Sequence, residues 1–175
     1  MLIISNHVTS CGMEVPHNAV IRVNIAWIKD KVELQDIIDA SEHSIFLDYP
    51  TGRFKPPVPT LTLDEAIDIA NSNSIVECFG VSNAEDLESM KKIREKLNDA
   101  ITLIPKIETK EGVSNLSQIV EGANTNMIML DKDDLYTNVR HNKDTFDFML
   151  VVVKSFCDIT KVQLLTLRGV IFSDE

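Results

Sequence analysis

Short apolar runs alternate with stretches whose apolar residues recur every three or four positions along most of this chain. The runs are typical of strands buried in a sheet, and the recurring stretches are typical of helices packed by one face. Strands are predicted over residues 19–27, 44–47, 75–81, 101–107, 126–130 and 162–167, with 169–172 extending the last. Helices are predicted over residues 30–38, 62–71, 82–97, 113–120 and 146–157.

Local signals support two of the helix starts and one connector. Thr62 is followed three residues later by Glu65, which is the capping-box pattern, and Ser82 with Glu85 repeats it. Residues 54–59 contain three prolines, and each proline restricts its own backbone and that of its predecessor. We therefore expect an extended connector after the second strand.

Strands that alternate with helices over short joints predict right-handed βαβ units and a parallel sheet. Such a sheet is either doubly wound or closed as a (β/α) barrel, and in both cases ligands bind beyond the carboxyl ends of the strands. We expect one such domain over residues 1–175. Polar residues near these ends are Arg22, Asn24, Asp48, Ser82, Lys106, Glu108, Asp131, Asp133, Asp134, Thr166 and Arg168.

Composition narrows the classes of partner. The chain has 175 residues and a net charge of −10, from 17 basic and 27 acidic side chains. That balance argues against nucleic acid and against an anionic membrane surface, both of which attract basic proteins. Clustered carboxylates are compatible with a metal ion.

The cysteines and the first residues bear on the compartment. Cys11, Cys78 and Cys157 are an odd number at wide spacing, which favours reduced packing residues. Residues 1–7 lack a signal-peptide pattern, and no apolar run approaches the length of a spanning helix. We expect a cytoplasmic protein.

Lys106 and Glu108 carry the sharpest chemical signal. Side chains alternate along a strand, so the two point the same way at one strand end. Glu108 and Asp134 would lie at neighbouring strand ends, where paired carboxylates suit Mg²⁺ or Mn²⁺. An ammonium beside the metal could stabilise an enolate oxygen. The alternatives are an ordinary ion pair at a loop, and an acidic turn in which Asp133 or Asp134 caps a helix.

The segment 104–115, IPKIETKEGVSN, resembles the pyruvate kinase motif AKIEN-EGV-N of that family's barrel domain. Four further segments resemble motifs of the same family in the same order along the chain, and a weaker match follows at 164–166. They are RVN at 22–24, LDY at 47–49, VSNAED at 81–86 and IMLDKDDL at 128–135. The set covers roughly residues 21–135 and points to the phosphoenolpyruvate/pyruvate superfamily, whose aldolases and lyases share a similar metal motif.

The resemblance implies a fold and a role for each matching residue. The fold is an α/β protein with a (β/α) barrel of the pyruvate kinase type, short at about seven strands. Glu108 and Asp134 would bind Mg²⁺ or Mn²⁺, and Asn24 and Asp48 would contribute to a K⁺ site. Lys106 would stabilise the enolate or the phosphoryl group. Arg22 would face phosphate, and Thr166 would lie near the substrate methylene. Asp133 and Lys55 complete the candidates as substrate-binding residues.

The chain also departs from that pattern. Ala26 and Trp27 replace a serine and a histidine beside the K⁺ site, and residues 131–134 lack the glycine of the family's ARGD turn. Residues 54–60 bridge the place where pyruvate kinases insert a nucleotide-covering lid. Three functions stay open: a kinase-like enzyme acting on phosphoenolpyruvate or a related oxo acid, a metal-dependent aldolase or lyase, and a degenerate barrel that binds or regulates.

An incomplete barrel would also leave sheet edges exposed. Proteins cover such edges by pairing or assembly. We therefore expect a homo-oligomer or a protein partner, besides a small-molecule oxo acid or phosphoenolpyruvate.

Overall fold

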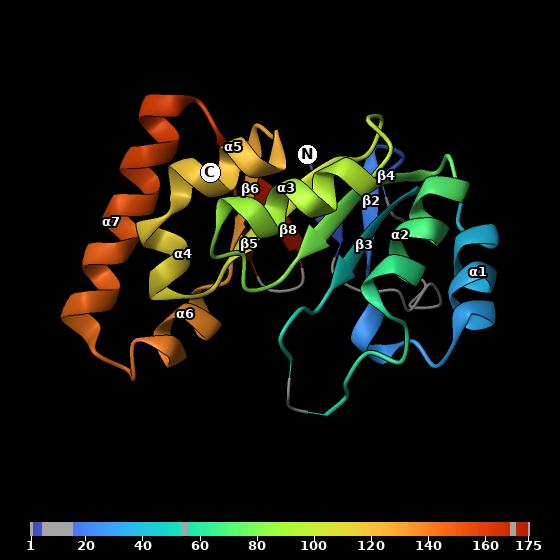
Figure 1. Ribbon diagram of the computed structural model, residues 1–175, viewed down its shortest axis with the longest axis horizontal. Coiled ribbons are helices and arrows are strands. Elements are labelled where there is room, and N and C mark those ends of the chain that lie inside the picture. Colours follow the sequence, from blue (N-terminus) through green and yellow to red (C-terminus); the bar gives the residue numbers. More distant parts are fainter. Residues whose placement is uncertain (1, 5–15, 54–55, 169–170, 175) are drawn as a thin grey trace.

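The computed structural model describes residues 2–4, 16–53, 56–168 and 171–174 (Figure 1). The strands are β1 (Leu2–Ile4), β2 (Ala19–Asn24), β3 (Ser44–Tyr49), β4 (Val76–Val81), β5 (Thr102–Ile107), β6 (Met127–Leu130), β7 (Gln163–Arg168) and β8 (Ile171–Asp174). The helices are the 3₁₀ turn η1 (Ile25–Trp27), α1 (Lys31–Asp39), α2 (Leu63–Ser72), α3 (Leu87–Lys96), α4 (Lys110–Ser114), α5 (Leu116–Ala123), α6 (Lys132–Asn138) and α7 (Lys143–Thr160). Strands and helices alternate from β2 to β7, as the hydrophobic pattern predicts, whereas β1 and α6 were not among the predicted elements.

The sheet follows the chain order. Strands β2 to β7 form a continuous six-stranded parallel sheet, and β1 joins β2 in parallel. Strand β8 pairs antiparallel with both β7 and β1, so the ladder of described strands closes on itself. The fold is therefore α/β with a barrel-like sheet.

The expectation of about seven strands is wrong at the end of the chain, where the described residues include an eighth strand. Residues 169–172 are predicted as an extension of the preceding strand, but residues 171–174 form β8, a separate strand that pairs antiparallel with β7. The two strands are too close in sequence for a helical stretch between them to reveal the second one. Because each described strand has two neighbours, exposed sheet edges no longer give a reason to expect an oligomer.

The inside of the sheet carries one apolar layer. Each of the strands β1 to β7 contributes one buried side chain to it: Ile3, Val20, Phe46, Cys78, Ile104, Met129 and Leu165. Phe46 fills much of this space because its neighbour Gly80 has no side chain. A Cβ atom at Gly80 would come within 2.6 Å of the Phe46 ring. This layer is the floor on which the polar residues at the strand ends rest.

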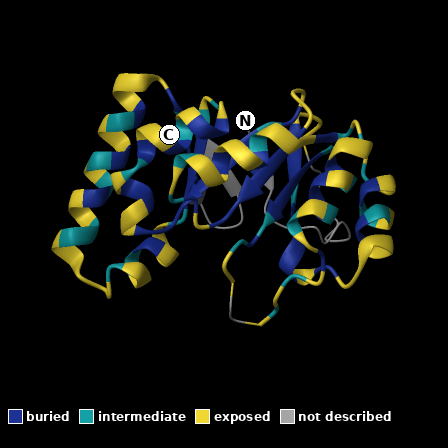
Figure 2. Cartoon of the chain, in the orientation of Figure 1, coloured by how far each residue is buried: buried dark blue, intermediate teal, exposed yellow. Residues whose placement is uncertain are grey.

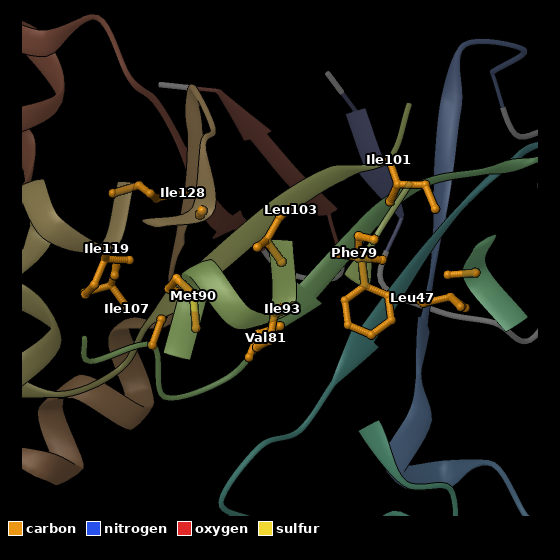
Figure 3. Packing of buried hydrophobic residues seen from close by; sticks show 14 of the residues in the cluster. Leu47, Phe79, Val81, Met90, Ile93, Ile101, Leu103, Ile107, Ile119 and Ile128 are labelled. Carbon is orange, nitrogen blue, oxygen red and sulfur yellow. The ribbon is translucent and has the colours of Figure 1, made fainter. Parts of the chain in front are cut away.

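The other face of the sheet packs against the helices. Its buried residues form a second, larger cluster that joins alternate strand positions to the apolar faces of the helices. Figure 3 shows part of it, with Met90 and Ile93 of α3 beside β-strand residues such as Val81 and Leu103. Figure 2 shows the helices exposed on their outer sides. Two neighbouring residues of one strand therefore belong to different layers.

One of the two predicted capping boxes is correct. Thr62 caps α2 and exchanges hydrogen bonds with Glu65. Ser82 instead follows β4 directly, and α3 begins later, where the Asp86 side chain accepts a hydrogen bond from the Ser89 amide. Helix α6 is capped by Asp131 rather than by either aspartate after it.

Candidate functional site

Polar side chains replace the apolar floor towards the carboxyl ends of β2 to β5. Positions two residues after Val20, Phe46 and Ile104 share their face of the sheet, because side chains alternate along a strand. These positions are Arg22, Asp48 and Lys106. Two residues further on, Asn24 on β2 and Glu108 just after β5 share the same face. The strand pattern thus stacks an ionic layer directly above the apolar one.

The ionic layer is a buried network of two cations and two anions. Asp48 is 1 % exposed and accepts hydrogen bonds from Arg22, whose Nε lies 2.8 Å from Asp48 Oδ2. Lys106 Nζ lies 3.4 Å from the same oxygen and 2.9 Å from Glu108 Oε1. Ser82 Oγ is a further partner of Lys106 at 2.9 Å. Opposite charges therefore balance where water is excluded, as buried ions require.

The network determines which groups stay charged. Burial alone would raise the pKa of Asp48, but the charges of Lys106 and Arg22 hold it below its ordinary value. Burial alone would lower the pKa of Lys106, and the carboxylates of Asp48 and Glu108 raise it instead. Burial raises the pKa of Glu108 despite the neighbouring ammonium. Glu108 is thus the acid of this network that a further cation would stabilise most.

Glu108 also belongs to a cluster of three carboxylates. One oxygen each of Glu108, Asp131 and Asp134 lie within 4.8 Å of one another. Glu108 follows β5, Asp131 follows β6, and Asp134 lies in the first turn of α6, where its amide donates to Asp131 Oδ1 at 3.2 Å. Three carboxylates converging on one point can hold a divalent cation. The donor set fits Mg²⁺ or Mn²⁺, and the geometry does not select one metal.

A strained loop orients Glu108 from the opposite side. The backbone amide of Asn83 donates to Glu108 Oε2 at 2.8 Å. Asn83 adopts a left-handed conformation with φ of 51°, and its side chain donates to the Thr51 carbonyl at 2.7 Å. Gly52 beside it also has a positive φ, 72°, which glycine adopts at little cost. The loops after β3 and β4 therefore hold the carboxylate in place.

These groups surround one cavity of about 540 Å³ at the carboxyl ends of the strands. That volume suits a small organic ligand. The cavity is lined by two cationic side chains, Arg22 and Lys106, and by the three carboxylates of the acidic cluster. Its other walls are Asn24, Pro50, Thr51, Gly52, Arg53, Ser82, Asn83, Thr109, Thr137 and Asn138.

The structure brings together Lys106, Glu108, Asp134 and Arg22 from the sequence-predicted candidates. It adds Asp131, which the sequence placed among the polar residues near the strand ends without naming it as a metal ligand. The signal was present, because Asp131 lies two residues after Met129 and so continues the inward face of β6. The distance between strand ends was the missing information.

The arrangement of Asn24 and Asp48 gives the predicted K⁺ site no support, and that site stays a prediction. Asp48 is already bound by two cationic side chains, which would repel a further cation. The Asn24 side chain accepts a hydrogen bond from the Ala26 amide at 3.0 Å and so caps η1. Neither belongs to the carboxylate cluster.

Thr166 faces away from the cavity. Leu165, beside it, belongs to the apolar floor, so Thr166 shares the opposite face with Leu164. Its register partner Leu130 also packs in the helix-facing cluster. This orientation does not favour the predicted contact with the substrate methylene, which stays a prediction. The prediction overlooked that neighbouring residues of a strand face opposite sides of the sheet.

The last two candidates lie elsewhere. Asp133 is exposed in the first turn of α6 and does not line the cavity. Lys55 lies outside the residues that the structure describes. Substrate binding by either stays a prediction.

Comparisons with known proteins place the fold but not the family. No protein-family model and no curated protein matches the chain. Among solved structures it is similar to the crystal structure of citrate synthase SbnG, with a TM-score of 0.62 and 15% sequence identity. The match covers 87% of this chain and 69% of that one. At this identity the likeness supports a barrel-like α/β fold of the TIM type, and the pyruvate kinase resemblance gains no support.

Within the part of the chain that the structure describes, no helix is both long and apolar enough to cross a membrane.

Proposed function

We propose that this protein binds a divalent cation at Glu108, Asp131 and Asp134 and uses the site for lyase- or aldolase-type chemistry on a small 2-oxo acid. One observation carries the proposal. A buried Glu108 carboxylate joins a cluster of three acids on one side to the Lys106 ammonium on the other. A cation and an ammonium beside the same cavity-lining carboxylate suit a ligand that develops negative charge on oxygen.

The metal, when bound, would polarise the oxo group of the ligand as a Lewis acid. Lys106 supplies a positive charge beside the oxygen on which negative charge grows. The Asp48 and Glu108 carboxylates raise the pKa of Lys106, so that its ammonium stays protonated. Arg22 supplies a guanidinium for the ligand's carboxylate, a group that arginine recognises well.

Lyase chemistry is favoured over phosphoryl transfer because the segment between β3 and α2 is too short for a domain that covers a nucleotide. The link from β3 to α2 comprises residues 50–62, which cannot contain a nucleotide-covering domain. The chain is structurally similar to citrate synthase SbnG, whose name describes no phosphoryl transfer. A metal-held oxo acid requires no nucleotide.

A second candidate is binding without turnover. It is favoured by Asp48, which already engages both cations, and by Thr166, which faces the helices. A ligand would then be held by the metal and the cationic layer with no bond broken. Turnover separates the two candidates.

Calorimetric titration with Mg²⁺ or Mn²⁺, followed by oxalate as an enolate mimic, tests the shared metal site. We expect metal binding, then metal-dependent oxalate binding, and loss of both in Glu108→Gln and Asp134→Asn. Asp133→Asn is the matched control, because it removes an acid from the same turn that does not line the cavity. Equal metal binding by Glu108→Gln and the native chain would overturn the proposal.

Pyruvate release from a 4-hydroxy-2-oxo acid tests the chemistry. We expect release that requires Mg²⁺ or Mn²⁺ and no nucleotide, and that falls by at least 100-fold in Lys106→Met while metal binding persists. Metal and oxalate binding without any release would leave the binding candidate and reject the lyase.

A further inference from the structure

The outer face of helix α7 carries three exposed apolar side chains, together with the exposed polar residues Asp144 and Ser155. In Figure 1 it forms one end of the molecule along the long axis, and Figure 2 shows its outer side exposed. Its inner face is anchored by buried residues at helical spacing, Met149, Val153 and Cys157. The opposite face presents Phe148, Val151 and Ile159, which are 67%, 62% and 80% exposed.

These three residues lie on one stripe. Their positions, with Ser155 between the last two, follow the spacing of three and four residues that keeps side chains on one helix face. An apolar stripe of several turns on a helix end of the molecule is typical of an interaction surface rather than of a solvated face. The question is what covers it.

The charged residues beside the stripe answer that question. Lys143, Asp147, Lys154 and Asp158 follow one flank of α7, at intervals of four, seven and four residues. Read in the opposite direction, the intervals are the same and each charge is replaced by its opposite. A helix with this pattern is complementary to an antiparallel copy of itself.

We propose that α7 packs antiparallel against α7 of a second copy of this chain, about a twofold axis between Leu150 and Val151. Around that axis Lys143 opposes Asp158 of the other copy, and Asp147 opposes Lys154. In antiparallel helix pairs the same flank of both helices meets, so both rows come together on one side. The Val151 side chains, half a residue from the axis, meet each other in the apolar stripe.

The apolar stripe supplies the affinity and the charges fix the register. Exposed ion pairs contribute little free energy each, but like charges in the wrong register are repelled. Lys143 and Asp147 already form an ion pair within the helix, which would become part of the row. Helix α7 is only about 27 Å long, so the interface is small and we expect a weak, concentration-dependent dimer.

Sedimentation velocity and equilibrium over a wide range of protein concentration test this surface. We expect a monomer–dimer equilibrium that is weakened at least tenfold by Val151→Glu, which places two carboxylates at the axis. Val32→Glu is the matched control, because Val32 is 68% exposed and belongs to α1, the helix at the other end of the long axis from α7 in Figure 1. Circular dichroism and thermal unfolding confirm that each variant is folded.

A charge exchange tests the register. Asp147→Lys places lysines opposite each other and should weaken the dimer severalfold, and Asp147→Lys with Lys154→Asp should restore it. Failure of the double variant to recover would reject the antiparallel register. Two results would overturn the proposal: a folded native chain that stays monomeric at the highest concentration, or a dimer that Val32→Glu weakens as much as Val151→Glu does. Neither result bears on the metal site.

Discussion

The buried Asp48 carboxylate allows the most direct test of the ionic layer. Asp48→Asn keeps the shape of the side chain and removes the negative charge that lies between Arg22 and Lys106. Two largely buried cations then share only Glu108 as an acid within the network. The variant should therefore be less stable than the native chain.

The magnitude follows from the burial of the partners. Asp48, Lys106 and Arg22 have side chains that are 1%, 6% and 14% exposed, so water screens little of the lost attraction. Removal of one partner from a buried ion pair costs about 3–5 kcal/mol. A domain has only about 5–15 kcal/mol of total stability. At this size each kcal/mol shifts the unfolding temperature by about 2–4 °C, so a decrease of about 6–20 °C is expected.

Urea unfolding followed by circular dichroism measures the difference, with Asp133→Asn as the exposed control. The pKa of Asp48 is lowered in the folded state, so its stabilising effect is present above its ordinary pKa of 3.8 and is lost as the pH falls through the folded value. The gap between native and Asp48→Asn should be full at pH 7 and shrink in strong acid. A gap below about 1 kcal/mol at pH 7, where a buried pair predicts several, would contradict the reasoning.

Three further outcomes follow from the same layers. Gly80→Ala should destabilise the protein by about 1–3 kcal/mol in urea unfolding, because its Cβ atom would meet the Phe46 ring at 2.6 Å and overpack the floor. Thr166→Val should leave metal-dependent oxalate binding within about twofold, since Thr166 faces the helices; a loss like that of Glu108→Gln would disprove this orientation. The raised pKa of Glu108 lets a proton compete with the cation, so calorimetric metal affinity should fall as the pH is lowered from about 7 to 5, and an affinity independent of pH would show that Glu108 is not a ligand.

The hydrophobic pattern predicted most of the elements because each needs only local information. Apolar runs and helical stripes mark which residues each segment must bury, whatever its neighbours are. The same logic placed Lys106 and Glu108 on one face, and their atoms lie 2.9 Å apart. Strand β8 was missed because it follows β7 too closely in sequence for a helical interval, and the second capping box failed because Asp86 competes with Ser82 for the start of α3.

The site needed more than local information. The sequence alone could name Glu108 and Asp134 as candidate ligands, but not the third acid, since the separation of Asp131 from Glu108 depends on how β5 and β6 align. Resemblance suggested Asp48 as a cation ligand, and the structure gives it Arg22 and Lys106 as partners instead. A sequence motif specifies residue types, whereas cation binding also depends on which other charged side chains the fold places next to those residues.

The sequence by itself thus determined most of the strands and helices between β2 and β7, the acidic balance and the residues at the strand ends. Only the tertiary structure decided which of those residues share a cavity, that Thr166 faces the helices, and that β8 joins the two ends of the sheet. The physical reason is the separation in sequence over which each kind of interaction acts. Burial patterns arise within a segment, but the contacts between charges depend on the register and closure of strands that are distant in the chain.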